Sequence, residues 1–523
     1  MINLYLTSIV LLLSIPFMNI LAMDKATPAI DWPSIEETAR QFVEQESPDS
    51  VWPFEHSTYQ HVKSDKKVFA HFFSPFPLSF DNKATGEDAY SQLHLSPEGS
   101  DKYLKGRGGY IVGGGGTLRQ RPLPVNQWDS PDWKRINLAI EVLRAERIGL
   151  DGFTYDMLGV SPDNEHRRIL EMLLEVSERV APDFKIALMP DMNAELKSKA
   201  DILVDVLLDL THYKSLYYVE DGRLLVAPYN AFKQPKEYWK VLIKKMKDAG
   251  HPIAFLPVQV GYEHLDKNGV LYQNIIYGLT DWGFRDIDYA EQYDFRNSKQ
   301  AASPYTDKWM FPVAPQDVRS KSLIAWEAEN TRTFRYLWDA AIKGDSQYVQ
   351  LVTWNDYSEA SEISPSSGSQ FAYYDLTAYY TTWFKTGTPP AIKEDAIYYT
   401  HRAQIFPFPE GVVAEKQRKP FGNAGKTPFI NNVEMVALLT EPAVIEIEQN
   451  GQEFRANTAA GLATLSVPVQ EGRPVFRIIR DQEIVLETES NWEVKLGGAV
   501  ENPVYHGGSS TRPFTPTPAY GEY

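Results

Sequence analysis

Two carboxylic acids, Asp356 and Glu359, stand three residues apart in the segment Trp354-Asn355-Asp356-Tyr357-Ser358-Glu359. Such a pair suits cleavage of a glycosidic bond, which needs one protonated carboxyl for the leaving oxygen and one ionised carboxyl that activates water or attacks directly. Two carboxyls close together also push their pKa values apart, which yields one acid and one base. In an extended chain they would lie about 10 Å apart on opposite faces, so a shared target requires a turn just after Trp354. The alternative is that Asp356 caps a turn and Glu359 is solvated.

The elements that must position this pair are predicted by short apolar stretches that alternate with segments of helical periodicity. Helices are predicted to begin near residues 130 and 161, and to span 194–208, 235–250 and 375–385. Repeated strand and helix units of this kind predict a (β/α)8 TIM-type barrel over residues 23–389. The eight expected strands are 67–73, 147–157, 184–191, 223–229, 252–260, 277–284, 308–314 and 348–354.

Residues at the carboxyl ends of these strands are candidates for substrate binding, because the loops there converge over one mouth of such a barrel. For His71, Asp156 and Asp191 the alternative is structural hydrogen bonding inside the barrel, since buried carboxylates must be paired either way. The aromatic candidates could equally fill the core. The predicted substrate-binding residues are His71, Tyr155, Asp156, Asp191, Tyr229, Asp281, Trp282, Trp354 and Asn355, with Asn230, Tyr262, Glu263, Gln316 and Asp317 completing the ring.

A second domain is expected after Thr388-Pro389-Pro390, where a proline pair indicates a linker. Short strands with period-two patterning follow, at 444–448, 475–478 and 484–486, with an Asn450-Gly451 turn after the first. This pattern predicts a small antiparallel β-sandwich over residues 390–501. Residues 502–523 are rich in Gly, Pro, Ser and Thr and are expected to form a flexible tail.

Composition excludes several classes of function. The formal net charge of -17 argues against a nucleic-acid partner, since binding phosphates requires a basic face. With no cysteine and ten scattered histidines, no metal site is predicted, and the Gly-rich tract 106–116 lacks the ending of a phosphate-binding loop. The aromatic fraction of 13% suits sugar rings, whose C–H faces stack on aromatic faces. A polysaccharide partner without a cofactor is therefore expected, and the oligomeric state is not predicted.

The N-terminus resembles a targeting signal. An apolar run over residues 9–18 is followed by Asn19-Ile20-Leu21-Ala22 and an acidic start at Asp24, which predicts a signal peptide over residues 1–22. An uncleaved N-terminal anchor is the alternative. The protein is accordingly expected to be secreted, periplasmic or at the cell surface, with no membrane span after cleavage.

The late carboxylate motif also carries a family resemblance. Thr353-Trp354-Asn355-Asp356-Tyr357-Ser358-Glu359 resembles the Thr-Trp-Asn-Asp-Tyr-Gly-Glu-Ser segment of glycoside hydrolase family 71, the α-1,3-glucanases or mutanases. Further similar stretches, in order, are 68–72, 149–153, 190–192 and 277–282. The resemblance implies a (β/α) barrel followed by a β-sandwich, hydrolysis of an α-linked polysaccharide with inversion, and Asp356 and Glu359 as the catalytic pair. One of the two is then the acid and the other the base for water, and we favour Glu359 as the acid.

The sequence departs from the family pattern at two places. After Glu359 it has Ala360-Ser361-Glu362-Ile363 where the family has Ser-His-Tyr-Ile, and near the seventh strand it has Ala314-Pro315-Gln316 where the family has Ser-Pro-Trp. The His, Tyr and Trp side chains that this sequence lacks are candidate sugar contacts. The resemblance therefore supports the type of reaction better than it supports the sugar or the linkage that is cleaved. Two alternatives follow: hydrolysis of another α-glycan such as α-mannan, as in the related endo-α-mannosidases, and a non-catalytic glycan-binding barrel.

Overall fold

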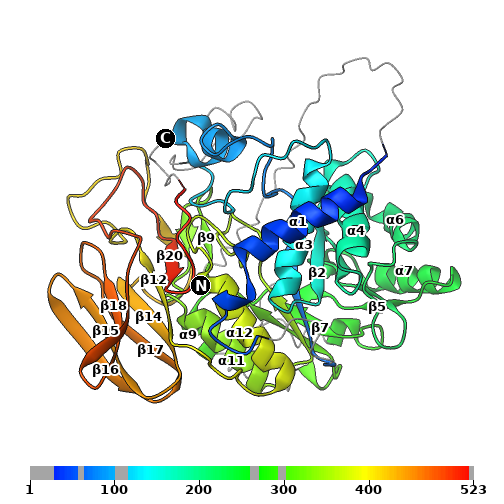
Figure 1. Cartoon of the computed structure of the whole chain (residues 1–523). Helices are drawn as coiled ribbons and strands as arrows, with labels where there is room; N and C mark the ends of the chain where they lie inside the picture. The colour runs from blue at the N-terminus through cyan, green and yellow to red at the C-terminus, as the bar shows by residue number, and fades with distance from the viewer. Residues whose placement is uncertain (1–28, 57–63, 101–115, 260–269, 293–301, 518–523) are drawn as a thin grey trace.

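A computed structural model describes residues 29–56, 64–100, 116–259, 270–292 and 302–517. Its centre is a parallel β-sheet, surrounded by helices in Figure 1. The predicted signal peptide, the Gly-rich tract up to residue 115, and Tyr262 and Glu263 lie outside the described residues. The strands of the sheet are β1 (Lys67–Phe72), β2 (Gly152–Met157), β3 (Lys185–Pro190), β4 (Leu224–Val226), β5 (Ile253–Phe255), β6 (Val258–Gln259), β7 (Leu279–Asp281), β8 (Trp309–Val313) and β11 (Tyr348–Leu351).

The sheet has the cyclic strand order of a (β/α)8-type barrel. Its order is β5-β4-β3-β2-β1-β11-β8-β7-β6, and every printed pairing in it is parallel. The two ends of this order, β5 and β6, are separated along the chain only by Leu256 and Pro257. Tyr229, just after β4, also forms a bridge with Val258 of β6. Taken as one interrupted strand, β5 and β6 bring the count to the eight positions that the sequence predicts.

Helices follow most of these strands, and their bounds differ from the predictions mainly at the ends. The predicted helix 194–208 is broken into α5, a 3-10 turn and α6, and the strand predicted from residue 147 begins only at Gly152 because the helix before it continues through Arg147. The structure also contains three helices without a prediction, α1, α9 and α11. The helices are α1 (Trp32–Glu46), α3 (Trp133–Arg147), α4 (Glu165–Val180), α5 (Leu196–Lys199), α6 (Leu203–Leu210), α7 (Lys236–Asp248), α9 (Ile287–Gln292), α11 (Arg332–Lys343) and α12 (Ala372–Thr386).

Successive side chains of a barrel strand point alternately into the barrel and out towards the helices. In β1, Phe69 belongs to the inner cluster that contains Met189 and Met310, whereas Phe72 packs in the outer layer with Tyr155. The parity of each strand therefore decides which of its end residues can face the mouth of the barrel.

The C-terminal region forms a β-sandwich, drawn in yellow, orange and red beside the barrel in Figure 1. Two four-stranded antiparallel sheets, β17-β14-β12-β20 and β16-β15-β18-β19, share one apolar cluster. The predicted turn is confirmed, because Asn450 and Gly451 join β15 and β16 with φ values of 52° and 78°. The strands are β12 (Ala396–Arg402), β14 (Asn432–Leu439), β15 (Ala443–Gln449), β16 (Gln452–Thr458), β17 (Gly461–Pro468), β18 (Val475–Arg480), β19 (Glu483–Glu489) and β20 (Tyr505–Ser509).

The prediction of a flexible tail from residue 502 is wrong for its described part. Strand β20 pairs antiparallel with β12 along its whole length. Its glycines are required by packing, because a Cβ at Gly508 would lie 2.2 Å from the hydroxyl oxygen of Tyr399 and one at Gly507 would lie 2.9 Å from the Cβ of Ala372. Glycine in this segment therefore permits close approach of the backbone rather than mobility.

Arg512, beyond β20, ties the chain end to the barrel helices. Its Nε and Nη2 donate to the two carboxylate oxygens of Asp375 in α12 at 2.8 and 2.7 Å, and its Nη1 donates to the Glu46 carbonyl and the Ser47 hydroxyl, both at 2.9 Å. Arg512 is 8% exposed and Asp375 is fully buried. The pair closes the contact between the first helix, the last barrel helix and the C-terminal segment.

Arg512→Ala is expected to lower the free energy of unfolding by about 3 to 5 kcal/mol, because it leaves the Asp375 charge buried without its partner. Urea denaturation followed by circular dichroism measures this loss. The matched control is Arg332→Ala, which removes an exposed pair with Glu329 and Glu291 and is expected to change stability by less than about 1 kcal/mol. Equal urea midpoints for Arg512→Ala and Arg332→Ala would contradict the stabilising role of the Arg512–Asp375 pair.

Candidate active site

The segment after β11 folds back on itself. Thr353 N donates to Ser361 O at 2.8 Å, and Ile363 N donates to Thr353 O at 3.0 Å. Within the loop, Glu359 N and Ser361 N both donate to Asp356 O at 3.3 Å. The turn that the two carboxylates require is therefore present, and both lie at the carboxyl ends of the barrel strands.

Asp356 is 7% exposed and accepts several hydrogen bonds. Its Oδ1 accepts from Ser358 N at 2.9 Å, from Ser358 Oγ at 2.6 Å and from Glu359 N at 3.3 Å. Burial raises the pKa of this carboxyl, whereas the hydrogen bonds from Ser358 and the charge of Lys321 oppose the rise. Burial has the larger effect on the pKa of Asp356, and the hydrogen bonds from Ser358 limit the rise by stabilising the ionised form.

Glu359 lies in a different environment. Its side chain is 20% exposed, and its Oε1 is 3.2 Å from Nη2 of Arg319. Burial raises the pKa of Glu359 to about 8, the charge of Arg319 opposes this, and the negative charges of Asp317 and Asp356 add to it. The backbone carbonyl of Glu359 accepts from Val318 N at 2.6 Å. Glu359 therefore holds a proton near neutral pH, and its side chain is partly exposed although its Oε2 is buried without a hydrogen-bond partner among the described residues.

Three further titratable side chains gather at the ends of β1, β2 and β3. His71 Nε2 is 3.7 Å from Asp156 Oδ2. Burial lowers the pKa of His71 to about 4, raises that of Asp191 to about 8, and raises that of Asp156 well above its usual value, with the charge of Asp356 adding to the rise at Asp156. Among the described residues, His71 Nδ1 and Asp156 Oδ1 have no hydrogen-bond partner. At neutral pH this cluster is an uncharged set of donors and acceptors.

Aromatic rings lie against this cluster. Trp282 packs edge-on against His71 with ring centroids 4.7 Å apart, and against Tyr229 at 4.9 Å. Both Trp282 and Tyr229 are half-buried, so each residue keeps some exposed surface. Burial and the negative charges of Glu359 and Asp191 raise the pKa of the Tyr229 phenol.

Two of the predicted substrate contacts face the other way. Tyr155 donates from its hydroxyl to His166 O at 2.6 Å and stacks on Phe72 between the sheet and α4. Trp354 is fully buried, and its Nε1 donates to Glu141 Oε2 of α3 at 2.7 Å. Both side chains belong to the layer between the strands and the helices, so we do not retain them as substrate contacts.

Asn355 and Asp281 have local structural partners. Asn355 is fully buried, accepts from Phe73 N at 2.7 Å, and donates to the carbonyls of Phe73 and Phe76 at 3.1 Å. It fixes the loop after β1 against the carboxylate segment. Asp281 is 1% exposed and accepts from Gly283 N at 2.6 Å, which shapes the turn that carries Trp282.

The sequence reasoning missed the basic residues of the site. Arg319 donates to both oxygens of Asp317 at 2.9 and 2.7 Å, and Arg285 Nε lies 3.4 Å from Asp317 Oδ2. Asp317 is fully buried. Of these three residues, only Asp317 is in the predicted ring of strand-end residues. Gln316, which is also in that ring, accepts from Tyr505 N of β20. The signal available in the sequence for these basic residues was a pair of opposite charges, Asp317 and Arg319, two positions apart after the seventh strand.

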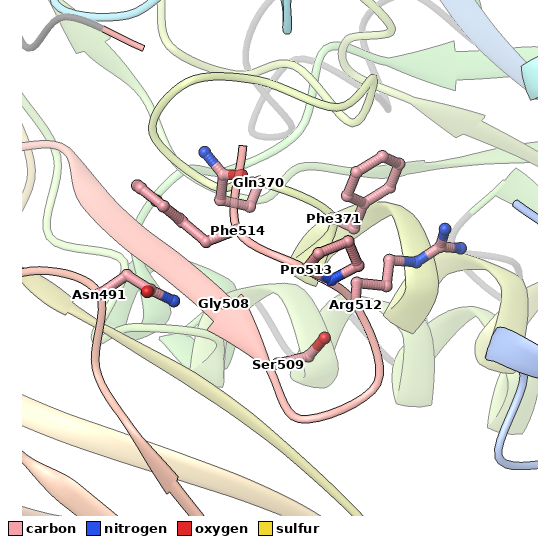
Figure 2. Close-up of a pocket in the computed structure, with 8 residues that line it drawn as sticks. All are labelled: Gln370, Phe371, Asn491, Gly508, Ser509, Arg512, Pro513 and Phe514. Atoms are coloured by element: carbon pink, nitrogen blue, oxygen red, sulfur yellow. The ribbon is translucent and has the colours of Figure 1, made fainter. Parts of the chain in front are cut away.

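No group of three or more His, Cys, Asp or Glu side chains within the described ranges could hold a metal ion. No helix in the same ranges is both long and apolar enough to cross a membrane. The pocket drawn in Figure 2 is lined by neither Asp356 nor Glu359 and lies where the segment before α12 meets β20 and the residues after it. Its one charged side chain, Arg512, is engaged by Asp375, so the pocket offers no comparable chemistry. The lining residues are Gln370, Phe371, Asn491, Gly508, Ser509, Arg512, Pro513 and Phe514.

Comparison with known proteins gives consistent matches. Residues 127–505 match the sequence model of Glycosyl hydrolase family 71. A curated relative, glucan endo-1,3-alpha-glucosidase agn1 of Schizosaccharomyces pombe, is 21% identical over 69% of this chain and 85% of its own. Mutanase Pc12g07500 of Penicillium rubens is 24% identical over 36% of this chain and 44% of its own. Among solved structures, the GH99 endo-alpha-mannosidase of Bacteroides thetaiotaomicron is similar at 12% identity with a TM-score of 0.47, covering 62% of this chain and 98% of its own.

Proposed function

Because the chain belongs to glycosyl hydrolase family 71 and is therefore a glycoside hydrolase, we propose that it cleaves internal bonds of α-1,3-glucan outside the cytoplasm. The names of two curated relatives, a glucan endo-1,3-alpha-glucosidase and a mutanase, support the substrate. The observation that carries the proposal is the placement of Asp356 and Glu359 in one tight turn with unlike surroundings. The apolar N-terminal run supports secretion, which N-terminal sequencing of protein from the medium tests.

The roles of the two carboxyls follow from their surroundings. Glu359, with a pKa near 8, is protonated at neutral pH and can give its proton to the leaving oxygen. Asp356 is stabilised as a carboxylate by the hydrogen bonds from Ser358, so it serves as the base that activates water. We propose direct displacement with inversion, as the family resemblance implies. Proton NMR of the first product formed tests this, because inversion releases the β-anomer.

The neutral cluster suits a sugar. Hydroxyl groups are uncharged and need both donors and acceptors, which protonated Asp156, Asp191 and neutral His71 supply together. Trp282 and Tyr229 add partly exposed aromatic side chains beside them. We propose that these five residues bind the sugar next to the scissile bond.

The test is release of reducing ends from a panel of insoluble α-1,3-glucan, α-1,4-glucan and α-1,6-mannan. Release of oligosaccharides from α-1,3-glucan alone is the expected result. Activity on the mannan alone would overturn the substrate assignment but keep the chemistry. Binding without cleavage of any polymer would indicate a glycan-binding barrel instead.

The rate is expected to fall as pH rises through about 8, because the reactive form of Glu359 is protonated and its pKa is about 8. At low pH the rate falls as well, when Asp356 gains a proton. The measurement is kcat across the pH range with saturating substrate, since Asp191 has a similar pKa and its ionisation would act on KM. A rate that rises through pH 8 would reverse the roles of the two carboxyls.

A further inference from the structure

A short β-hairpin from the barrel reaches the carboxyl pair from outside the main sheet. Strands β9 (Val318–Arg319) and β10 (Ile324–Ala325) pair antiparallel in the chain between β8 and α11. Val318 N donates to the Glu359 carbonyl at 2.6 Å, so the hairpin is attached to the backbone of the acid. Arg319, the next residue, is the one whose guanidinium lies 3.2 Å from the Glu359 carboxyl.

The guanidinium of Arg319 is oriented by two neighbours, Asp317 and Trp326. Asp317 binds it through two hydrogen bonds, and the ring of Trp326 lies 4.8 Å from it. Trp326 N in turn donates to Asp317 O at 3.0 Å, across the hairpin. Because the planar guanidinium is held in this way, its Nη2 keeps a fixed position beside the Glu359 carboxyl.

The far edge of the hairpin is held by the C-terminal region. Strand β13 (Gly422–Asn423), which lies between β12 and β14 of the sandwich, pairs parallel with β10. Gly422 N donates to Leu323 O at 2.8 Å, and Ala424 N donates to Ala325 O at 2.9 Å. Without these bonds the hairpin would consist of two strands of two residues each, which is too short to be stable alone.

Other contacts fix β13 relative to the barrel. Asp286, just before α9, accepts from Lys426 N at 2.9 Å and Thr427 N at 2.8 Å. Glu327, just beyond the hairpin, is fully buried and accepts from Arg402 of β12 at 2.9 Å. The region that follows the barrel therefore holds the hairpin at the edge of β10 and at Glu327, just beyond it.

We propose that Arg319 is a positioning residue for Glu359, and that strand β13 of the C-terminal region holds the hairpin that carries it. The sandwich region is then a working part of the active site rather than a separable attachment. This inference rests on the proposed role of Glu359 as the general acid.

Gly422 allows this link to be removed without a change to either carboxyl or to Arg319. Gly422→Pro removes the N–H that bonds to Leu323 O, whereas Gly422→Ala keeps it. A Cβ at residue 422 would meet only Leu323 O, at 3.9 Å, and the residue is exposed, so Gly422→Ala is a matched control. Arg319→Gln removes the charge directly, and Arg319→Lys restores it without the planar geometry.

The expected result is that Gly422→Pro and Arg319→Gln each lower kcat by about 10- to 100-fold, because the acid is misplaced. Both variants also move the alkaline limb of the kcat profile to higher pH, by about one unit or more, since the Arg319 charge opposes protonation of Glu359. Gly422→Ala keeps the wild-type profile of kcat against pH. Arg319→Lys restores the position of the alkaline limb more fully than it restores kcat, because lysine supplies the charge without the planar geometry. Adding Gly422→Pro to Arg319→Gln has little further effect, because both act through one side chain.

A readout without substrate separates this inference from the proposed function. The protonated carboxyl band of Glu359 is followed by infrared difference titration, with Glu359→Gln subtracted to assign it. A midpoint that rises in Arg319→Gln and Gly422→Pro but not in Gly422→Ala supports the inference even if no tested polymer is cleaved. If the wild-type enzyme cleaves α-1,3-glucan, and Arg319→Gln and Gly422→Pro keep its titration midpoint and its kcat profile, the inference is overturned and the proposed function stands. If Gly422→Pro fails to fold, Arg319→Gln against Arg319→Lys gives the same decision for Arg319.

Discussion

Glu359→Gln is expected to lower kcat on α-1,3-glucan by about 10²- to 10⁴-fold, because the amide has no proton to give to the leaving oxygen. The substitution keeps the shape of the side chain and an oxygen that can accept from Arg319, so the loop is expected to remain folded. The measurement is initial rate on the polymer and on an aryl α-1,3-oligosaccharide with a dinitrophenyl leaving group. The aryl substrate needs no proton, so most of the lost rate should return with it.

Glu362→Gln is the matched control for this variant. Glu362 lies in the same returning loop, is 1% exposed, and has a pKa that burial raises to about 8. It is therefore also protonated near neutral pH, and the amide replaces it with little change in charge. Glu362→Gln should keep kcat within about threefold on both substrates, a change of less than about 1 kcal/mol in the barrier. Equal losses for Glu359→Gln on the two substrates would exclude Glu359 as the proton donor.

The positions of the barrel strands could be predicted because strands buried on both faces are continuous apolar stretches. The same property hides which face each side chain takes. In β2, Thr154 and Asp156 face inward while Phe153 and Tyr155 face the helices, and all four are buried, so burial alone does not distinguish the two faces. For this reason Tyr155 and Trp354 were predicted at the mouth, although the structure places them in the outer layer.

The carboxylate loop could be predicted better than its surroundings. The requirement for a turn follows from the spacing of two acids that must share one target, and the backbone hydrogen bonds after β11 confirm it. Arg319 and β13 could not be found in this way, because two-residue strands carry no periodicity and their pairing joins residues about a hundred positions apart. The segment at β20 was misjudged because its place depends on backbone bonds and on glycines that permit close packing.

Asp356→Asn is expected to lower kcat by about 10²- to 10⁴-fold on every substrate, including those with activated leaving groups. The amide oxygen can still accept the hydrogen bonds from Ser358 N, Ser358 Oγ and Glu359 N, so the turn is preserved while the proton acceptor is lost. This pattern differs from that of Glu359→Gln, because attack by water still needs a base when the leaving group is good.

The same variant is also expected to shift the pH dependence of the rate, in the direction opposite to the shift expected for Arg319→Gln. The negative charge of Asp356 helps to raise the pKa of Glu359, so its removal should lower that pKa and move the alkaline limb of the residual rate below pH 8. Ser358→Ala is the matched control: it removes one hydrogen bond to Asp356 but keeps the carboxylate, and less than about a tenfold loss in kcat is expected. Azide, which attacks without a base, should restore turnover in Asp356→Asn and yield a glycosyl azide. If azide gives no product and the alkaline limb stays in place, Asp356 neither activates the attacking water nor acts on Glu359, and the two-carboxylate mechanism fails.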